Sequence, residues 1–193
     1  MDKKLKSGIL AMLIICLYPL FPLSVAAEDS PSPVLGYTLD MLPVILSASE
    51  GRAGYSFQVW AGLNRIKIRV IGAHLLMPQS MIKDSFEDYE VNVAAILIDY
   101  FFTRDLRGFW IGSGVELWNS SVKHKKTGET TLFTDSIITA GGGYVWHLTE
   151  HVYLNPFAAL HFRINDSKVL AGNEEFTRKK FSSSASVKIG YRF

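Results

Sequence analysis

The sequence predicts an all-β fold, an eight-stranded antiparallel up-and-down β-barrel, and three observations lead to it. Residues 34–193 contain eight stretches in which apolar and polar side chains alternate, and a period of two is that of a β-strand. No stretch in this region reaches the 18 consecutive apolar residues of a membrane helix, and none shows a sustained helical stripe. The connections between the stretches are alternately short and long, as in up-and-down barrels of this kind.

Length and composition exclude several classes of protein. The chain has 193 residues, of which 48% are hydrophobic and 20% are charged, so it is too apolar to be disordered. The formal net charge of +2 is too small for a nucleic-acid partner, which would need a concentrated basic face. Cys16 is the only cysteine, which leaves no disulfide framework and no thiolate metal cluster.

The first 27 residues are predicted to be a cleaved signal peptide. Three lysines precede an apolar stretch at 9–23, and small residues then provide a cleavage site before Glu28. An uncleaved anchor is the alternative, and two prolines in the apolar stretch argue against it. Three of the 20 basic and one of the 18 acidic residues fall in this leader, which leaves 17 of each. Residues 28–33 form a polar lead-in, and 34–193 form the barrel domain.

The first three strands are predicted at 35–46, 54–62 and 65–76. The first is the least regular, because Pro43 cannot donate a hydrogen bond to a neighbouring strand. One face of the second carries the apolar residues Tyr55, Phe57, Val59, Ala61 and Leu63. The third sets an apolar face against a basic one, which consists of Arg65, Lys67 and Arg69.

The other five strands are predicted at 88–101, 108–119, 131–147, 151–164 and 179–193. The fourth contains the longest clear apolar run beyond the leader, at 93–98. In the sixth, three consecutive glycines at 141–143 indicate a bend or close packing in the wall. The last strand shows the alternation best, and its apolar face carries Phe181, Ala185, Val187, Ile189, Tyr191 and Phe193.

Aromatic and charged residues indicate which face of the barrel points outward. A soluble lipocalin-like barrel would turn the apolar face inward around a ligand, whereas a membrane barrel turns it outward. Aromatic residues, with Phe101, Trp110 and Tyr153 among them, gather near the strand ends, as they do at membrane interfaces. The opposite face carries charges of both signs, which can pair inside a narrow barrel. The sequence therefore predicts a transmembrane barrel with short periplasmic turns and longer extracellular loops.

The end of the chain carries a family resemblance. Residues 187–193 (VKIGYRF) resemble the C-terminal strand of bacterial outer-membrane proteins, and 108–115 (GFWIGSGV) resembles strands of the small OmpA/OmpX-type and OmpW-type barrels. The resemblance implies a cell outer-membrane location, contact with outer-membrane lipids, and delivery by the barrel-assembly machinery, with Tyr191 and Phe193 as the assembly signal. We expect a monomer with no nucleic-acid partner.

No catalytic residue, cofactor or metal site is predicted, so we expect a protein that is not an enzyme. Barrels of this size that are lipid A deacylases carry a His-x-Ser pattern. In this chain residues 161–163 are HFR, so the resemblance does not extend to that pattern. Pairing of the last two strands could bring His161 near Ser182 or Ser184. The sequence shows no third group that would orient this histidine, which catalysis requires.

Charged residues are expected to cluster in two places. The expected lumen network comprises Arg65, Lys67, Arg69, Glu90, Glu116, Lys188 and Arg192. An unpaired charge is costly in a narrow lumen, so at least one basic residue should pair, and Lys67 or Arg69 with Glu116 is the expected pair. Basic residues that could meet lipopolysaccharide phosphates, or simply form solvated loops, are Lys123, Lys125, Lys126, Arg178, Lys179 and Lys180.

The expected function is that of a non-enzymatic structural or surface-binding scaffold. Eight strands enclose an interior just wide enough to be filled by side chains, and the outer loops would contact lipopolysaccharide or external partners. The first alternative is a narrow transporter of small hydrophobic compounds, and the second is a lipid A-modifying barrel enzyme. A soluble periplasmic ligand-binding barrel is the alternative at the level of the fold.

Overall fold

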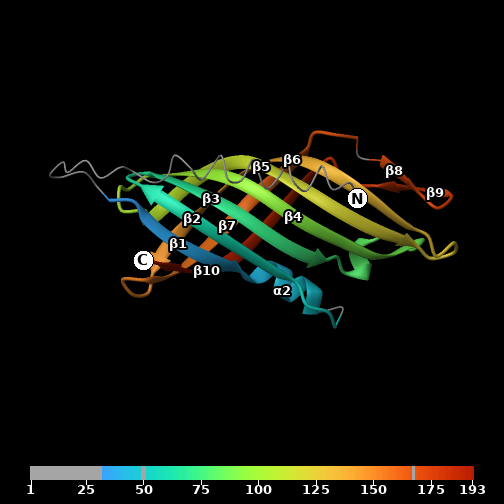
Figure 1. The fold of residues 1–193 in the computed structure, drawn as a ribbon, viewed down its shortest axis with the longest axis horizontal. Coiled ribbons are helices and arrows are strands. Elements are labelled where there is room, and N and C mark those ends of the chain that lie inside the picture. Colours follow the sequence, from blue (N-terminus) through green and yellow to red (C-terminus); the bar gives the residue numbers. More distant parts are fainter. Residues whose placement is uncertain (1–31, 49–50, 167) are drawn as a thin grey trace, which may run out of the picture. The chain divides into compact units, whose positions relative to one another are not determined.

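The computed structural model describes residues 32–48, 51–166 and 168–193, so the predicted signal peptide lies outside the described residues. The described chain forms a closed antiparallel barrel with the strand order β1-β10-β7-β6-β5-β4-β3-β2 (Figure 1). Its strands are β1 (Val34–Asp40), β2 (Tyr55–Leu63), β3 (Ile66–Leu76), β4 (Phe86–Phe101), β5 (Gly108–His124), β6 (Thr130–His147), β7 (Val152–Arg163) and β10 (Phe181–Arg192). The predicted fold class is confirmed. Among the described residues, no helix is long and apolar enough to cross a membrane.

The two ends of the barrel differ in their connections. At one end, called the turn end, short turns at 64–65, 102–107 and 148–151 join the strands. At the other, called the loop end, β5 and β6 extend further than expected, and only 125–129 separates them. Most of the long loop predicted at 120–130 is therefore strand, because apolar and polar residues continue to alternate there.

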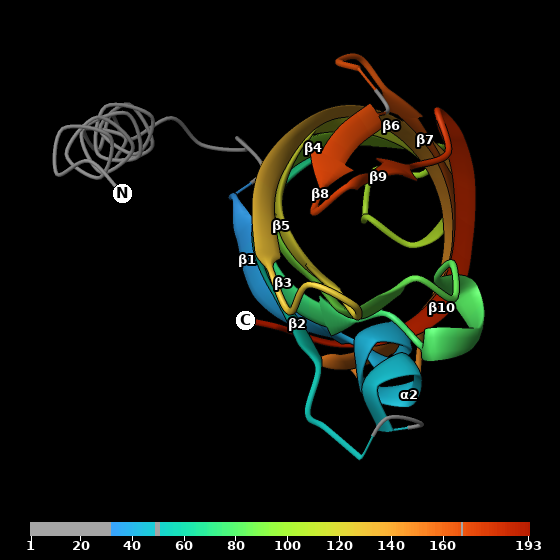
Figure 2. The ribbon, with the colours of Figure 1, turned by 90° about the vertical axis from the view of Figure 1, so that its right-hand side faces the viewer.

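The predicted first strand is too long, because a helix replaces its second half. β1 ends at Asp40, and α2 (Met41–Ala48) follows directly. Asp40 accepts a hydrogen bond from the Leu42 amide (3.0 Å), which is the geometry of a helix N-cap. Pro43 fits the first turn of the helix, where its missing N–H would have no partner anyway. The end view shows α2 between β10 and β2 (Figure 2), and it contacts both strands and β3.

Two further elements cover part of the loop end. The loop predicted at 165–178 contains a hairpin of β8 (Lys168–Ala171) and β9 (Glu174–Thr177), and the short helix η2 (Gln79–Met81) follows β3. Phe176 of the hairpin packs edge-on against Phe86 and Tyr89 of β4, with ring centroids 5.0 and 5.2 Å away. Figure 2 shows the hairpin crossing the mouth of the barrel. The mouth is thus partly closed by an apolar contact.

The outer face of the barrel is apolar, as predicted. Large apolar side chains exposed on the strands are Leu35, Leu39, Phe57, Val59, Ile66, Ile68, Ile96, Ile98, Ile111, Val115, Ile138, Leu160, Val187 and Ile189. The assignment of three aromatic residues to the membrane belts is wrong, because Phe101, Trp110 and Tyr153 are buried and pack into the lumen. Their positions on the alternating pattern place them on the inner face.

Candidate functional site

The turn end of the lumen is filled by aromatic and aliphatic side chains. This plug comprises Trp60, Phe101, Leu106, Trp110, Val145 and Tyr153. Leu106 reaches into the lumen from the 102–107 turn. It packs against Gly62, where any larger residue would collide with it, because a Cβ atom at position 62 would lie 2.3 Å from Leu106 Cδ1. The filled lumen expected from the sequence is therefore present at this end.

A layer of charge lies directly above the plug. Asp99 is fully buried and accepts two hydrogen bonds from Arg69, at 2.9 Å from Nε and 3.0 Å from Nη2. The ammonium of Lys67 lies 3.5 Å from the same carboxylate. Two of the expected basic residues are thus paired inside the lumen, but the expected pairing of Lys67 or Arg69 with Glu116 is wrong. The inner face of β4 carries the odd-numbered residues, which places Asp99 beside β3.

Three other residues expected in this network lie elsewhere. Arg65 precedes β3, is exposed, and donates a hydrogen bond to the Tyr100 hydroxyl (3.0 Å). Glu90 has the outward parity of β4 and pairs with Arg52 near the loop end. Both faces of β4 are apolar from 93 to 98, so alternation alone could not fix its inner face. Arg192 lies at the turn end, where it donates to the Asp105 carbonyl.

Lys188 is a buried cation without a carboxylate partner among the described residues. Its side chain is 2% exposed, and its ammonium lies 3.7 Å from the centroid of the Phe157 ring. The nearby Lys67 and Arg69 share the single carboxylate of Asp99. Asp40 faces Lys188 in register on β1, beyond ion-pair distance, so the three cations Lys67, Arg69 and Lys188 stand against the two carboxylates of Asp40 and Asp99.

A cavity of about 1250 Å³ lies above the charge layer. Arg69 and Lys188 line its lower part, and aliphatic residues of three elements line one side: Leu42, Leu46, Ile71, Ala73, Leu75, Val91, Val93, Ala95 and Leu97. These residues come from α2, β3 and β4. In this part of β3 and β4, both the inward and the outward side chains are apolar. The lumen is thus hollow toward the loop end, which corrects the expectation of a lumen filled along its whole length.

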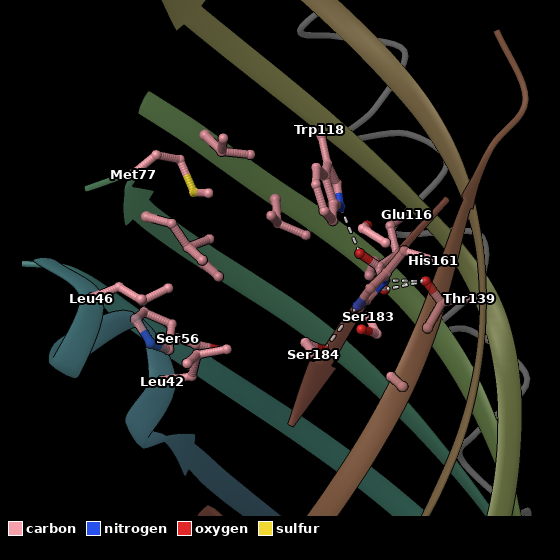
Figure 3. Close-up of a pocket in the computed structure, with 18 of the residues that line it drawn as sticks. Leu42, Leu46, Ser56, Met77, Glu116, Trp118, Thr139, His161, Ser183 and Ser184 are labelled. Carbon is pink, nitrogen blue, oxygen red and sulfur yellow. Dashed lines mark hydrogen bonds and ion pairs between the residues drawn. The ribbon is translucent and has the colours of Figure 1, made fainter. Parts of the chain in front are cut away.

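A connected polar cluster faces this aliphatic wall (Figure 3). Ser184 of β10 lies 2.9 Å from His161 Nε2, and Thr139 of β6 lies 2.9 Å from His161 Nδ1. The Thr139 hydroxyl donates to Glu116 Oε1 (2.7 Å), and the Trp118 indole donates to Glu116 Oε2 (2.6 Å). The third group that the sequence could not show is therefore present. Four adjacent strands, β5, β6, β7 and β10, hold the cluster together.

A second ion cluster lies near the mouth. The buried carboxylate of Asp135 binds Arg178, and its Oδ1 lies 3.1 Å from Arg163 Nε. Arg178 is thus buried, so its expected contact with lipopolysaccharide is wrong. Lys123 pairs with Glu87 (2.8 Å), whereas the other basic residues of that set are exposed: Lys125, Lys126, Lys179 and Lys180.

The β8–β9 hairpin is also tied down by charge. Glu174 pairs with Lys83 at 3.0 Å, which connects the hairpin to the loop after η2. Hydrogen bonds from Lys83 and Ser85 lower the pKa of Glu174 to about 2. The Glu174 carboxylate is therefore charged at neutral pH, where it can pair with Lys83. Among residues 32–48, 51–166 and 168–193, no group of three or more His, Cys, Asp or Glu could hold a metal ion.

The sequence contained a signal for part of this site. The run at 93–98 and the apolar residues at 70–73 lie on strands whose two faces are both apolar, which in a barrel indicates an apolar lumen wall. Asp99 follows that run on its inner face. The Ser184–His161 contact depends on the register between β10 and β7. Glu116 reaches His161 only because β5, β6 and β7 lie side by side in the wall.

Comparisons with known proteins give the following. No protein-family model and no curated protein matches the sequence. Among solved structures, the chain is similar to the N-terminal β-barrel domain of Pseudomonas aeruginosa OprF, with a TM-score of 0.49 and 12% identity over 85% of this chain and 98% of that chain. It is also similar to Neisserial surface protein A (NspA), with a TM-score of 0.46 and 14% identity over 83% and 94%. At these identities the likeness concerns the fold alone.

Proposed function

We propose that this chain is a barrel of the bacterial outer membrane that binds an anionic amphiphile in its lumen, a molecule with an acyl chain and a carboxylate or phosphate group. The observation that carries the proposal is the cavity of about 1250 Å³, aliphatic on one side and bounded below by the unpaired ammonium of Lys188. This function develops the transporter alternative rather than the scaffold.

The outer surface supports the membrane location. A closed barrel satisfies its backbone hydrogen bonds between strands, which a bilayer core demands. The strands expose many aliphatic and aromatic side chains, whereas charged side chains such as Lys67, Asp99 and Lys188 point inward. Aromatic rings also gather on the outer surface at the turn end, where Tyr37 and Phe193 both contact Tyr191. This is the arrangement of a lipid-facing wall.

The cavity suits a chain with one charged end. Pockets for small molecules commonly occupy about 300–1,000 Å³ and are mostly apolar with a few placed polar groups. The aliphatic wall of β3 and β4 would cover the acyl chain. A buried ammonium without a carboxylate partner is costly, and an anionic ligand group would satisfy Lys188.

The helix α2 provides a route between the membrane and the cavity. The β1–β10 ladder ends at the Asp40–Lys188 pair, so 181–187 of β10 has no strand partner on that side. The helix fills this seam: Leu42 N donates to Ser186 Oγ (3.1 Å), and Leu76 N donates to Ser47 Oγ (3.3 Å). Few hydrogen bonds hold α2, compared with a strand ladder. We infer that the acyl chain passes here.

Binding is tested with a fluorescent long-chain acid. The barrel, transferred from detergent into amphipol, should bind cis-parinaric acid saturably. Lys188→Met should weaken the affinity by roughly 10- to 100-fold, because a hydrogen bond to a charged group is worth about 1.5–3 kcal/mol. Fluorescence titration measures this effect.

Two controls separate the charge from general hydrophobicity. Lys125→Met, at an exposed loop position away from the cavity, should leave the affinity unchanged. The uncharged alcohol of the same chain should bind the wild type and Lys188→Met equally. Absence of saturable binding, or equal wild-type affinity for acid and alcohol, would contradict the proposal.

Loosening the seam should speed exchange in α2. Asp40 Oδ1 accepts hydrogen bonds from Leu42 N and from Ser186 Oγ (2.6 Å). Asp40→Ala removes this N-cap, which costs about 1 kcal/mol and should raise amide hydrogen exchange in the first turn of α2 about fivefold. Association of cis-parinaric acid should quicken in parallel. Asp84→Ala, at an exposed loop position, is the control. Unchanged exchange and association would argue against a route through α2.

A further inference from the structure

The polar cluster of the cavity fixes the tautomer of His161. The Thr139 hydroxyl has one proton, which it donates to the Glu116 carboxylate at 2.7 Å. Its oxygen must then accept from His161 Nδ1 at 2.9 Å, so that nitrogen carries the proton. In the neutral imidazole, His161 Nε2 then has a lone pair, and the Ser184 hydroxyl donates to it at 2.9 Å. A hydroxyl, a basic nitrogen and a carboxylate are thus connected in series.

Glu116 is held by more than this chain of hydrogen bonds. Its Oε1 lies 3.6 Å from His161 Nδ1, and its Oε2 accepts from the Trp118 indole. The side chains of Glu116 and His161 are 8% and 12% exposed, so the carboxylate and the imidazole lie side by side in a largely buried position. The order of nucleophile, base and carboxylate is that of serine hydrolases, except that here the Thr139 hydroxyl stands between the base and the carboxylate.

The seam beside β10 supplies donors close to Ser184. Phe193 N donates to Leu35 of β1, and Arg192 N donates to His151 in the turn before β7, so odd-numbered residues of β10 point their amides toward β1. The amides of Ser183 and Ala185 follow this rule, but β1 has ended before it reaches them. Backbone amides without a strand partner beside a nucleophile are the kind of donor that an oxyanion hole uses.

We propose that Ser184, His161 and Glu116 hydrolyse a carboxylic ester whose acyl chain lies in the lumen cavity. The inference rests on the proposed binding of an acyl chain, and adds a reaction to it. Ser184 and His161 are the catalytic residues, and Glu116 and Thr139 are positioning residues. The aliphatic wall across the cavity from Ser184 accepts the acyl chain (Figure 3).

The reaction needs only the ester and water. Ser184 Oγ attacks the carbonyl carbon while its proton moves to His161 Nε2. The bond to the alcohol oxygen breaks, and the departing alcohol takes that proton, which leaves an acyl-serine ester. Water then attacks the same carbon and gives a proton to His161 Nε2. Ser184 leaves with that proton, and the products are one carboxylic acid and one alcohol.

The first test uses the intact barrel and a serine-directed label. A fluorophosphonate carrying an alkyl chain should modify the folded protein, and peptide mass spectrometry should find the adduct on Ser184. Ser184→Ala and Ser184→Gly should both lose the label. Folding of each variant is checked by the mobility shift between unboiled and boiled samples on a gel. Label on another serine, or no label on a folded wild type, overturns the proposal.

The second test measures hydrolysis of p-nitrophenyl decanoate. Ser184→Ala should reduce kcat by about 10³-fold or more, since removing a triad member has effects of that size. Ser182→Ala is the matched control, because Ser182 lies on the same face two residues away, directly opposite His161 in register. Equal rates for the wild type and a folded Ser184→Ala variant overturn the proposal.

The positioning role has its own readout. Glu116→Gln should lower kcat with little change in KM and should shift the pH at which activity rises, because the imidazolium loses its carboxylate. Thr139→Val should lower kcat, and Thr139→Ser should restore it by returning the hydroxyl. A pH profile that stays the same in Glu116→Gln contradicts this role.

The experiments distinguish a failure of the proposed binding function from a failure of the proposed hydrolysis. If cis-parinaric acid binds but neither label nor hydrolysis depends on Ser184, the catalytic inference fails and the binding function stands. If Ser184-dependent hydrolysis occurs without saturable binding of the acid, the reaction stands and the proposed binding function fails.

Discussion

Asp99→Leu should destabilise the barrel by about 3–5 kcal/mol, the range for breaking a buried ion pair by removing one partner. Asp99 is the only carboxylate that pairs with Lys67 and Arg69 among the described residues, and all three side chains are at most 6% exposed. Its loss leaves two cations in a space bounded by Trp60, Phe101 and Trp110. Aromatic faces stabilise a cation only weakly by comparison.

Unfolding by urea in lipid vesicles, followed by tryptophan fluorescence, measures this effect. Asp105→Leu is the matched control, because Asp105 pairs with Arg107 in an exposed turn and should change stability by less than 1 kcal/mol. Replacing Lys67 and Arg69 by methionine together with Asp99→Leu should restore much of the loss, since the two cations that depended on Asp99 are then absent. A stable Asp99→Leu single variant would show that water compensates these charges.

Leu160→Arg should cost about 2–4 kcal/mol if the site lies near the bilayer midplane. Leu160 is 49% exposed on the outer face of β7, three residues before the end of the strand. An arginine there would stand in hydrocarbon. The same unfolding experiment in vesicles gives the value, and cell fractionation should recover the wild-type protein with the outer membrane.

The control for this variant lies outside the lipid-facing wall. Leu170 is 70% exposed on the β8–β9 hairpin, so Leu170→Arg makes the same change of side chain at the loop end. It should alter stability by no more than about 0.5 kcal/mol. Equal effects of the two substitutions, or recovery of the wild type as a soluble protein, would contradict the membrane location.

The wall of the barrel was predictable because its pattern is local. Successive side chains of a strand point to opposite faces, so the apolar face of 179–193 or 108–119 follows from the sequence. Pro43 indicated that the first predicted strand was irregular. A helix forms there because Asp40 caps it and because the barrel wall has an opening beside β10 that the helix fills. That gap depends on where β10 loses its partner, which is a tertiary property.

By itself, the sequence determined the eight strands of the barrel wall, the short turns at one end of the barrel, and most of the outward face. Tertiary structure alone decided which inward groups meet. Asp99 rather than Glu116 pairs with the basic residues of β3 because the register between β3 and β4 places Asp99 opposite Lys67. Glu116 instead joins His161 and Ser184 across four strands. A shift of one residue would turn each of these side chains to the other face, and no local pattern fixes inter-strand register where both faces are apolar.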